Sequence, residues 1–181
     1  MIIIGIDPGS RVTGYGIVDT SGSDDELVEF GVIRLDAETS HPMRLRTIYR
    51  SVVALIEEHV PDELAIEMPV YGRNPQSMLK LGRAQAAAML AGLNRDLPVA
   101  QYTPKEVKKS VTGNGNASKR QIRFMVHSIL KLDGPADTIT LDASDALAIA
   151  LCHGHREAHE DSQNYSGWSS FVDSNPDRVQ E

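Results

Sequence analysis

The sequence predicts an α/β fold in which a five-stranded mixed sheet carries helices on both faces. Two observations indicate this fold. Residues 2–35 contain three strand-like runs in succession, separated by short turns. From residue 42 onward, segments with a helical spacing of apolar residues alternate with two further short apolar runs. Three strands followed by alternating helices and strands is the order expected for a sheet that is covered on both sides.

The first three strands are expected to form an antiparallel meander. Residues 2–7 are dominated by isoleucine, which is typical of a buried strand, and end on Asp7. Residues 12–19 and 27–35 predict the second and third strands. The segments "DPGS" and "SGSDD" between these runs contain the residue types that form tight turns.

The middle of the chain predicts a helix, a strand and a second helix. Thr39, Ser40 and Pro42 mark the start of a helix that runs to about residue 59. The run "ELAIE" predicts a short fourth strand that ends on Glu67. A helix is then expected over residues 75–94. Its section "AQAAAMLAG" is rich in small residues, which suits close internal packing or a seam between two subunits.

The remainder predicts one strand and three helices. The run "LPVAQY" is expected to form the fifth strand. A short helix begins at Thr103-Pro104, and "TGNGN" breaks it. Apolar residues at helical spacing predict a helix across residues 122–130, and the last helix is expected from Asp142 to about His153.

Composition indicates the cellular compartment in which the protein works. No stretch is long and apolar enough to span a membrane, and the N-terminus lacks the features of a signal peptide. The single cysteine, Cys152, permits no internal disulfide and fits a reducing compartment. We therefore expect a cytoplasmic protein. Residues 1–156 are expected to form one domain, and residues 157–181 an acidic, polar tail without fixed structure.

The formal net charge of −7 hides a basic middle segment. Residues 73–131 carry 11 Lys and Arg against 2 Asp and Glu, whereas residues 1–72 carry 5 against 13. Local potential governs association with polyanions, so the basic segment is compatible with nucleic-acid binding. A solvated helix face rich in Lys and Arg would explain the same charges equally well.

Four carboxylates are candidates for a catalytic metal site. Asp7 and Glu67 each end an apolar strand, and Asp142 and Asp145 share one face in the first turn of the last helix. If the two strands are parallel neighbours, all four acids converge, and such a group needs cations to remain ionised. Carboxylate oxygens suit Mg²⁺, with Mn²⁺ as a substitute. Two such ions, about 3.5–4 Å apart, can promote phosphodiester hydrolysis.

Each acid also has an ordinary structural explanation. Asp7 suits a turn, Glu67 suits a solvated strand end, and Asp142 with Asp145 suits a helix start. These explanations leave open why two apolar strands both end in an acid. The segment "CHGH" at Cys152 is a second possible metal site, which we discount. Gly154 is expected to end the last helix, and a closed zinc site would need further soft ligands.

The basic segment supplies candidate DNA-binding residues. Lys119 and Arg120 lie in the first turn of a helix, where the helix dipole disfavours cations and a bound phosphate would offset that cost. Lys108 and Lys109 add charge just upstream. The segment "GNGNASK" does not match a P-loop, because Ser118 replaces the glycine that should precede the lysine.

The loop that follows Glu67 contributes further candidates for DNA binding. Tyr71 could stack on a base, and Arg73 and Lys80 could contact phosphates. Asn74 could hydrogen-bond a base or shape the turn.

Four ordered motifs resemble the RuvC-type Holliday junction resolvases. These motifs, "GIDPGSRVTGYG", "AIEMPVYGRNPQSMLKLGRAQ", "YTPKEVKKSVTGNGNASK" and "DASDALAIALCH", span about residues 1–155. The resemblance implies a ribonuclease-H-like fold in a homodimer that acts on four-way junction DNA in recombination and repair. It also implies Mg²⁺-dependent symmetric cleavage that leaves ligatable nicks, and a branch-migration motor complex as partner.

The resemblance assigns the metal-binding and catalytic acids to Asp7, Glu67, Asp142 and Asp145. Lys108 and Lys119 match family lysines near the scissile strand. The aromatic wedge that some members carry aligns with Val70 here, so Tyr71 as the stacking residue is a hypothesis.

Three other functions fit parts of the sequence. Another ribonuclease-H-like nuclease could act on a different nucleic acid. The chain could also be a binding module that binds branched DNA without cutting it, although the presence of all four acids argues against this. The first motif also resembles the phosphate loop of actin-like ATPases and sugar kinases, which need two such domains and a much longer chain.

Overall fold

The computed structural model describes residues 1–36, 39–69 and 74–162, with side chains described as far as residue 156. A five-stranded sheet lies at its centre, in the strand order β3-β2-β1-β4-β5. Strands β1 to β3 form an antiparallel meander, and β1, β4 and β5 run parallel. The predicted mixed sheet is therefore confirmed. The strands are β1 (Ile2–Asp7), β2 (Val12–Asp19), β3 (Glu26–Arg34), β4 (Glu63–Glu67) and β5 (Val99–Tyr102).

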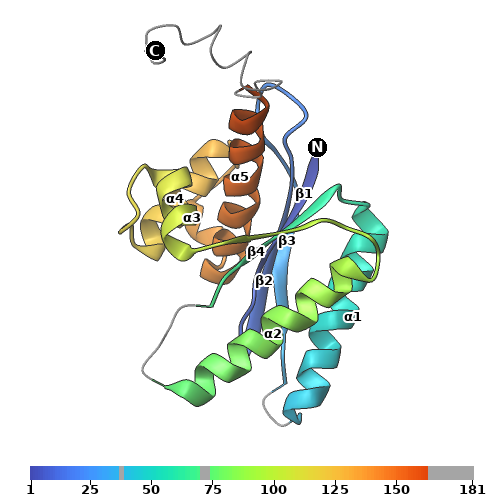
Figure 1. The fold of residues 1–181 in the computed structure, drawn as a ribbon. Helices are drawn as coiled ribbons and strands as arrows, with labels where there is room; N and C mark the ends of the chain where they lie inside the picture. Colours follow the sequence, from blue (N-terminus) through green and yellow to red (C-terminus); the bar gives the residue numbers. More distant parts are fainter. Residues whose placement is uncertain (37–38, 70–73, 163–181) are drawn as a thin grey trace, which may run out of the picture.

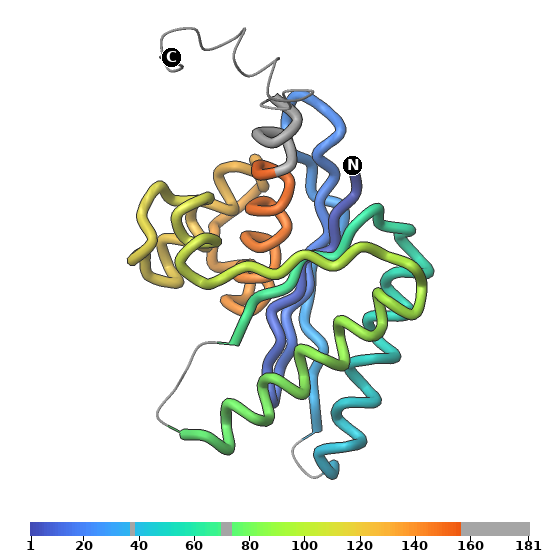
Figure 2. Tube along the Cα trace, viewed as in Figure 1, coloured from blue at the N-terminus to red at the C-terminus, as the bar shows by residue number. Residues whose placement is uncertain are grey.

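Helices cover both faces of this sheet, as Figure 1 shows. The pair α1 and α2 packs on one face, and α3, α4 and α5 pack on the other. The chain crosses from the first group to the second through β5 (Figure 2). The helices are α1 (His41–His59), α2 (Pro75–Leu93), α3 (Pro104–Thr112), α4 (Lys119–Ile129) and α5 (Leu141–Ser162), with a 3₁₀ turn η1 (Ala136–Thr138).

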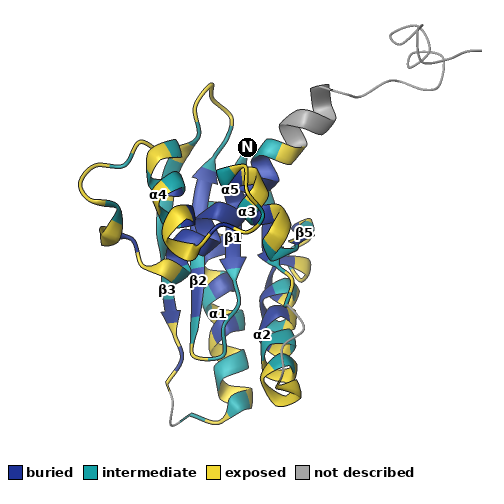
Figure 3. Cartoon of the chain, turned by 90° about the vertical axis from the view of Figure 1, so that its left-hand side faces the viewer, coloured by how far each residue is buried: buried dark blue, intermediate teal, exposed yellow. Residues whose placement is uncertain are grey.

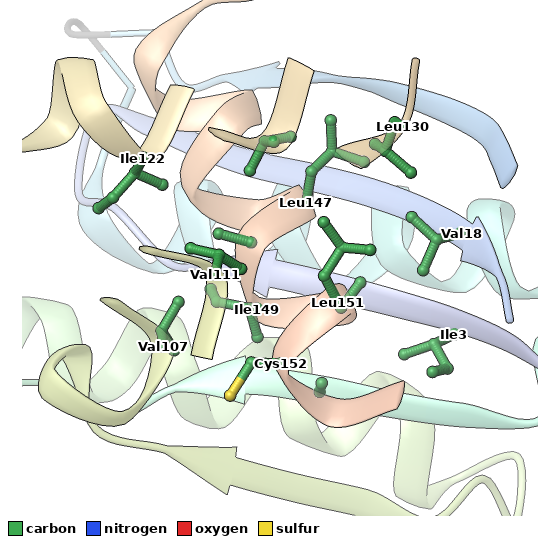
Figure 4. Packing of buried hydrophobic residues seen from close by; sticks show 14 of the residues in the cluster. Ile3, Val18, Val107, Val111, Ile122, Leu130, Leu147, Ile149, Leu151 and Cys152 are labelled. Atoms are coloured by element: carbon green, nitrogen blue, oxygen red, sulfur yellow. The ribbon is translucent and has the colours of Figure 1, made fainter. Parts of the chain in front are cut away.

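Alternation along the strands divides the core into two apolar layers. Successive residues of a strand point to opposite faces, so Ile3 packs toward α5 while Ile4 and Ile6 pack toward α1 and α2. On the α5 side, Leu147 and Leu151 contact the sheet (Figure 4). The central strands β1, β2 and β4 and the middle of α5 are largely buried, and the outer surfaces of α2 and α4 are exposed (Figure 3).

Local sequence explains where the helices begin. Thr103 and Glu106 form a capping box at α3, in which the Thr103 hydroxyl accepts from the Glu106 amide and the Glu106 carboxylate accepts from the Thr103 amide. Ser118 and Gln121 form the same arrangement at α4. Asn74 caps α2, with its side-chain oxygen accepting from two backbone amides.

The last helix is longer than the sequence predicted. The prediction that Gly154 ends the last helix is wrong, because α5 continues to Ser162. Gly154 instead lies against Thr20 and Ile3, where a Cβ would be 2.7 Å from a Thr20 methyl group. Most of the expected polar tail, residues 163–181, lies outside the described residues. Among the described helices, none is both long and apolar enough to cross a membrane.

Candidate active site

The carboxyl ends of β1 and β4 bring Asp7 and Glu67 together. The two strands are parallel neighbours, with Ile6 paired to Ile66, so the next residue of each strand is the acid. Asp7 shares its strand face with Ile3, and Glu67 shares its face with Ala65, and both of these residues belong to the core layer under α5. The two carboxylates therefore lie on the side of the sheet that α5 covers.

Glycines in β1 and β2 have no Cβ, so the backbone of α5 can contact the backbone of these strands directly. A Cβ on Gly14 would lie 2.0 Å from the carbonyl oxygen of Asp142, and a Cβ on Gly5 would lie 2.2 Å from that of Ala146. Gly14 is also the residue paired with Asp7 across the β1–β2 ladder. The first turn of α5, which carries Asp142 and Asp145, is thus held against β2 at the residue that pairs with Asp7.

Asp7, Glu67 and Asp145 have raised pKa values in this site. Burial, and then the negative charge of Asp145, raise the pKa of Asp7 to about 7, although Lys119 opposes the change. Burial, followed by the charges of Asp7 and Asp145, raises the pKa of Glu67 to about 7. The ionised forms of both carboxyl groups are therefore unfavourable here without additional positive charge.

Lys119 provides part of that positive charge. Its ammonium group hydrogen-bonds the Asp145 carboxylate. Burial raises the pKa of Asp145 despite this bond. Burial lowers the pKa of Lys119, but the bond and charge of Asp145 outweigh burial, and the net direction is upward. A lysine predicted to contact DNA thus lies within the acidic site.

Two small cavities flank the carboxylates. One, of about 130 Å³, lies between Glu67, Asp145 and two lysines; its lining is Glu67, Pro104, Val107, Lys108, Lys119, Ile122 and Asp145. The other, of about 290 Å³, opens toward α2; its lining is Asp7, Pro8, Glu67, Met68, Pro69, Leu81 and Gln85. Asp7, Glu67 and Asp145 therefore border space that a small ion or a phosphate oxygen could enter.

The donor set fits a hard divalent cation. All four ligand candidates are carboxylates, which Mg²⁺ and Mn²⁺ prefer, and a cation would remove the cost of ionising Asp7 and Glu67.

A different group of possible metal ligands is formed by Glu29, Glu58 and His59. Among the described residues, this is the group whose ligand atoms all lie within 4.8 Å of one another. In that group His59 Nε2 already lies 2.8 Å from a Glu29 carboxylate oxygen.

The predicted DNA-binding residues fall in different places. Lys108 lines the smaller cavity beside Glu67. Lys109 is exposed on α3, and Arg120 is exposed on α4 beside a cavity that also contacts Phe124.

The loop before α2 is partly outside the described residues. Tyr71 and Arg73 lie there, as does Val70, so the stacking hypothesis for Tyr71 stays a prediction. Asn74 caps α2, and its side-chain oxygen accepts from the amides of Gln76 at 3.0 Å and Ser77 at 3.3 Å. Lys80 is exposed on α2, one turn further along the helix.

Sequence reasoning missed Gln85, which supports Glu67. The Gln85 side chain is buried in α2, and its Nε2 donates to the Glu67 carbonyl oxygen at 3.3 Å and to Gln101 Oε1 at 3.1 Å. The signal was available, because Gln85 is the one polar residue in the run "AQAAAML".

The histidines of "CHGH" form hydrogen bonds within the protein. His153 is fully buried; its Nδ1 lies 2.6 Å from the Tyr102 hydroxyl and its Nε2 lies 2.8 Å from a Glu63 carboxylate oxygen. The network assigns the Nε2 proton to the bond with Glu63, so that Tyr102 donates to Nδ1. His155 Nε2 lies 2.9 Å from Asp25. Both histidines therefore have hydrogen-bond partners within the protein.

Comparison with solved structures places this fold among junction-cutting nucleases. The structure of Thermus thermophilus RuvC in complex with Holliday junction substrate superposes with a TM-score of 0.81 at 30% identity, over 88% of this chain and 96% of that one. The yeast mitochondrial Holliday junction resolvase has a TM-score of 0.64 at 14% identity, over 89% and 80% of the two chains. The second likeness concerns the fold alone.

Sequence comparison gives the same relationship. A protein of Salinibacter ruber described as crossover junction endodeoxyribonuclease RuvC is 67% identical over 181 residues, which is 100% of both chains. A Cytophaga hutchinsonii protein of the same description is 45% identical, over 98% of this chain and 88% of that one. The profile of the family itself matches residues 3–153, which include all four acids. The chain belongs to the crossover junction endodeoxyribonuclease RuvC family.

Proposed function

We propose that this chain is a Holliday junction resolvase, an endonuclease that cuts two strands of a four-way DNA junction by metal-dependent phosphodiester hydrolysis. The observation that supports this most strongly is the meeting of Asp7, Glu67, Asp142 and Asp145 at one edge of the sheet. Membership of the RuvC family supports the junction as substrate.

Each residue at the site has a separate task. Divalent ions held by the four carboxylates, two per site with Mg²⁺ as the expected species, would supply an activated water and stabilise the leaving oxygen. The backbone of β1 and β4 fixes Asp7 and Glu67, and contact with Gly14 fixes the start of α5. Lys119 is half-exposed, and its ammonium has three donors, so it can donate to a phosphate oxygen as well as to Asp145. Lys108 adds positive charge on the same side.

A homodimer would place two such sites on the two symmetric strands of a junction. The C-terminal half of α2 offers a surface for this, because Ala86, Leu90 and Leu93 are exposed at helical spacing along one stripe. Two-fold pairing would bury the same stripe of both subunits. Leu90→Glu should therefore convert the dimer to a monomer in sedimentation analysis, with no change in its circular dichroism. A monomeric parental protein would contradict this assembly.

A branch-migration motor complex is the partner that we propose to present junctions to this dimer. The proposal stems from the family relationship.

A cleavage assay tests the proposed activity. The protein is incubated with a labelled four-way junction and with a linear duplex, in Mg²⁺ and in EDTA. We expect paired nicks in the junction alone, dependent on Mg²⁺, and a loss on the order of 10³-fold in Asp7→Asn. Asp19→Asn is the matched control, because Asp19 ends β2 but pairs with the N-terminal amine. Equal cutting of linear DNA, or binding without cutting, would overturn the proposal.

A further inference from the structure

Four cationic or titratable side chains gather at the start of α1 and the facing part of α2. His41 and Arg44 come from α1, and Lys80 and Arg83 come from α2; we call these four residues the α1–α2 cationic cluster. Their proximity is visible in the pKa of His41, which is lowered first by burial and then by the charges of Arg83, Lys80 and Arg44. Like charges at such proximity repel one another unless an anion lies between them.

Two cations of this cluster, Lys80 and Arg83, have no neutralising partner within the described part of the chain. Lys80 and Arg83 form no hydrogen bond or ion pair there, and the buried Nε2 of His41 has no hydrogen-bond partner. The first turn of α1 contains no acidic side chain, and Ser40 makes no side-chain cap. The amides at this helix start therefore add to the attraction for an anion.

Arg44 connects the cluster to the active site. Its guanidinium donates to the carbonyl oxygen of Thr39 at 3.1 Å and to that of Ser10 at 3.4 Å. Ser10 belongs to the turn that follows Asp7. The start of α1 is thus fixed to the turn that leaves the acidic site.

A cavity also joins the cluster to the acids. Arg83 lines a cavity of about 650 Å³ along α2, together with Met68, Pro69 and Gln85. The same three residues line the cavity at Asp7 and Glu67. Because Lys108 and Lys119 lie on the α3–α5 side, the acids are flanked by cations on both faces of the sheet.

We propose that the α1–α2 cationic cluster binds phosphates of the DNA strand on the α1–α2 side of the cut site. Lys108 and Lys119 would contact the same strand on the other side, so the strand crosses the edge of the sheet over the four acids and is held at both ends. This inference rests on the proposed function, and it adds His41, Arg44 and Arg83 to the residues predicted from the sequence.

Salt dependence of junction binding tests the inference. The full-length protein is titrated onto a labelled four-way junction in EDTA at several KCl concentrations. Each phosphate contact contributes about 0.9 to the slope of log K against log[salt]. Lys80→Gln and Arg83→Gln should therefore each reduce the slope by about 0.9, and the double variant by about 1.8. Arg83→Lys should keep the slope, since a point charge is sufficient for a phosphate.

Arg50→Gln is the matched control. Arg50 is an exposed cation on α1, but it lies nine residues after His41, or about 2.5 turns, and so projects from the opposite side of the helix. It should leave the slope unchanged. This inference alone would be overturned if the slopes for Lys80→Gln and Arg83→Gln equalled the slope for Arg50→Gln while the parental protein cut junctions normally. A parental protein that neither binds nor cuts a junction would overturn the proposed function as well.

Discussion

The two faces of the sheet are built differently. On the α1–α2 face, large side chains such as Ile4, Ile6 and Ile17 separate the strands from the helices. On the α5 face, Gly5 and Gly14 leave the strand backbone in direct contact with the helix backbone.

This difference explains where the acids lie. A helix that rests on backbone atoms has little freedom to shift, whereas side chains can change rotamer to accommodate a displacement. Asp142 and Asp145 belong to the helix with the backbone contact, and Asp7 and Glu67 point to the same face. The cationic cluster lies on the face with side-chain packing, where binding a flexible DNA backbone requires less accurate placement.

The largest effect is expected from Gly14→Val, which breaks the backbone contact. The new Cβ would meet the Asp142 carbonyl oxygen, a backbone atom that cannot rotate away. We expect a loss of about 3 kcal/mol or more in the free energy of unfolding and no detectable junction cutting. Urea unfolding and the junction assay measure both effects.

Gly82→Ala on the other face is the matched control. A Cβ at Gly82 would meet nothing within 4 Å, and alanine favours the helix. Stability should rise by about 0.5–1 kcal/mol with cutting retained. Similar losses in the two glycine variants would show that backbone contact is not what distinguishes the α5 face.

A smaller effect is expected where His153 connects α5 to β4 and β5. His153→Leu should leave the Tyr102 hydroxyl and the Glu63 carboxylate without their partner, at a cost of about 2 kcal/mol in unfolding free energy. His155→Leu is the control, since its pair with Asp25 is partly exposed and should cost less than about 0.5 kcal/mol. Equal costs would contradict the structural role of the buried network.

The smallest effect is expected from Gln85→Met, which alters the α2 support of Glu67. The substitution removes the donor to the Glu67 carbonyl oxygen but keeps the length of the side chain. Gln85→Met also removes the bond to Gln101 Oε1. Junction cutting should slow by about 3–10-fold while junction affinity is unchanged, because the support that Glu67 loses is one modest hydrogen bond. Gln76→Met, at an exposed position of the same helix, should cut at the parental rate. A Gln85→Met protein that cuts at that rate would exclude this positioning role.

Much of the fold and the acidic site followed from local sequence signals. The apolar runs that end in Asp7 and Glu67 are strands with those ends, and the two strands have the parallel pairing on which the convergence of the acids depended. The spacing of Asp142 and Asp145 placed both at the start of α5. These features could be predicted because strand periodicity and helix starts depend on neighbouring residues.

Other features depend on contacts between distant residues. Gly154 looked like a helix end because glycine often occupies that position, but it lies inside α5 against Thr20. Lys119 looked like a phosphate ligand alone, and its bond to Asp145 depends on how α4 packs against α5. The cationic cluster joins residues about 40 positions apart, and no local pattern indicated that His41 and Arg83 would meet.

We expect the four acids to be held together at a cost in stability that bound cations relieve. A carboxyl group with a raised pKa in the folded state holds its proton more tightly there than in the unfolded chain. Stability therefore falls as pH rises from the ordinary values of 3.8 for Asp7 and 4.5 for Glu67 toward about 7. In EDTA, the unfolding free energy should decrease between pH 5 and pH 8, and should decrease less in Asp7→Asn.

The most direct measurement is thermal unfolding of the parental protein and Asp7→Asn at pH 8, with and without Mg²⁺. In EDTA we expect Asp7→Asn to melt at the higher temperature, by about 2–4 °C for each kcal/mol of repulsion removed. Added Mg²⁺ should raise the melting temperature of the parental protein and leave that of Asp7→Asn nearly unchanged. A variant that is less stable than the parent in EDTA, or that responds equally to Mg²⁺, would contradict the account.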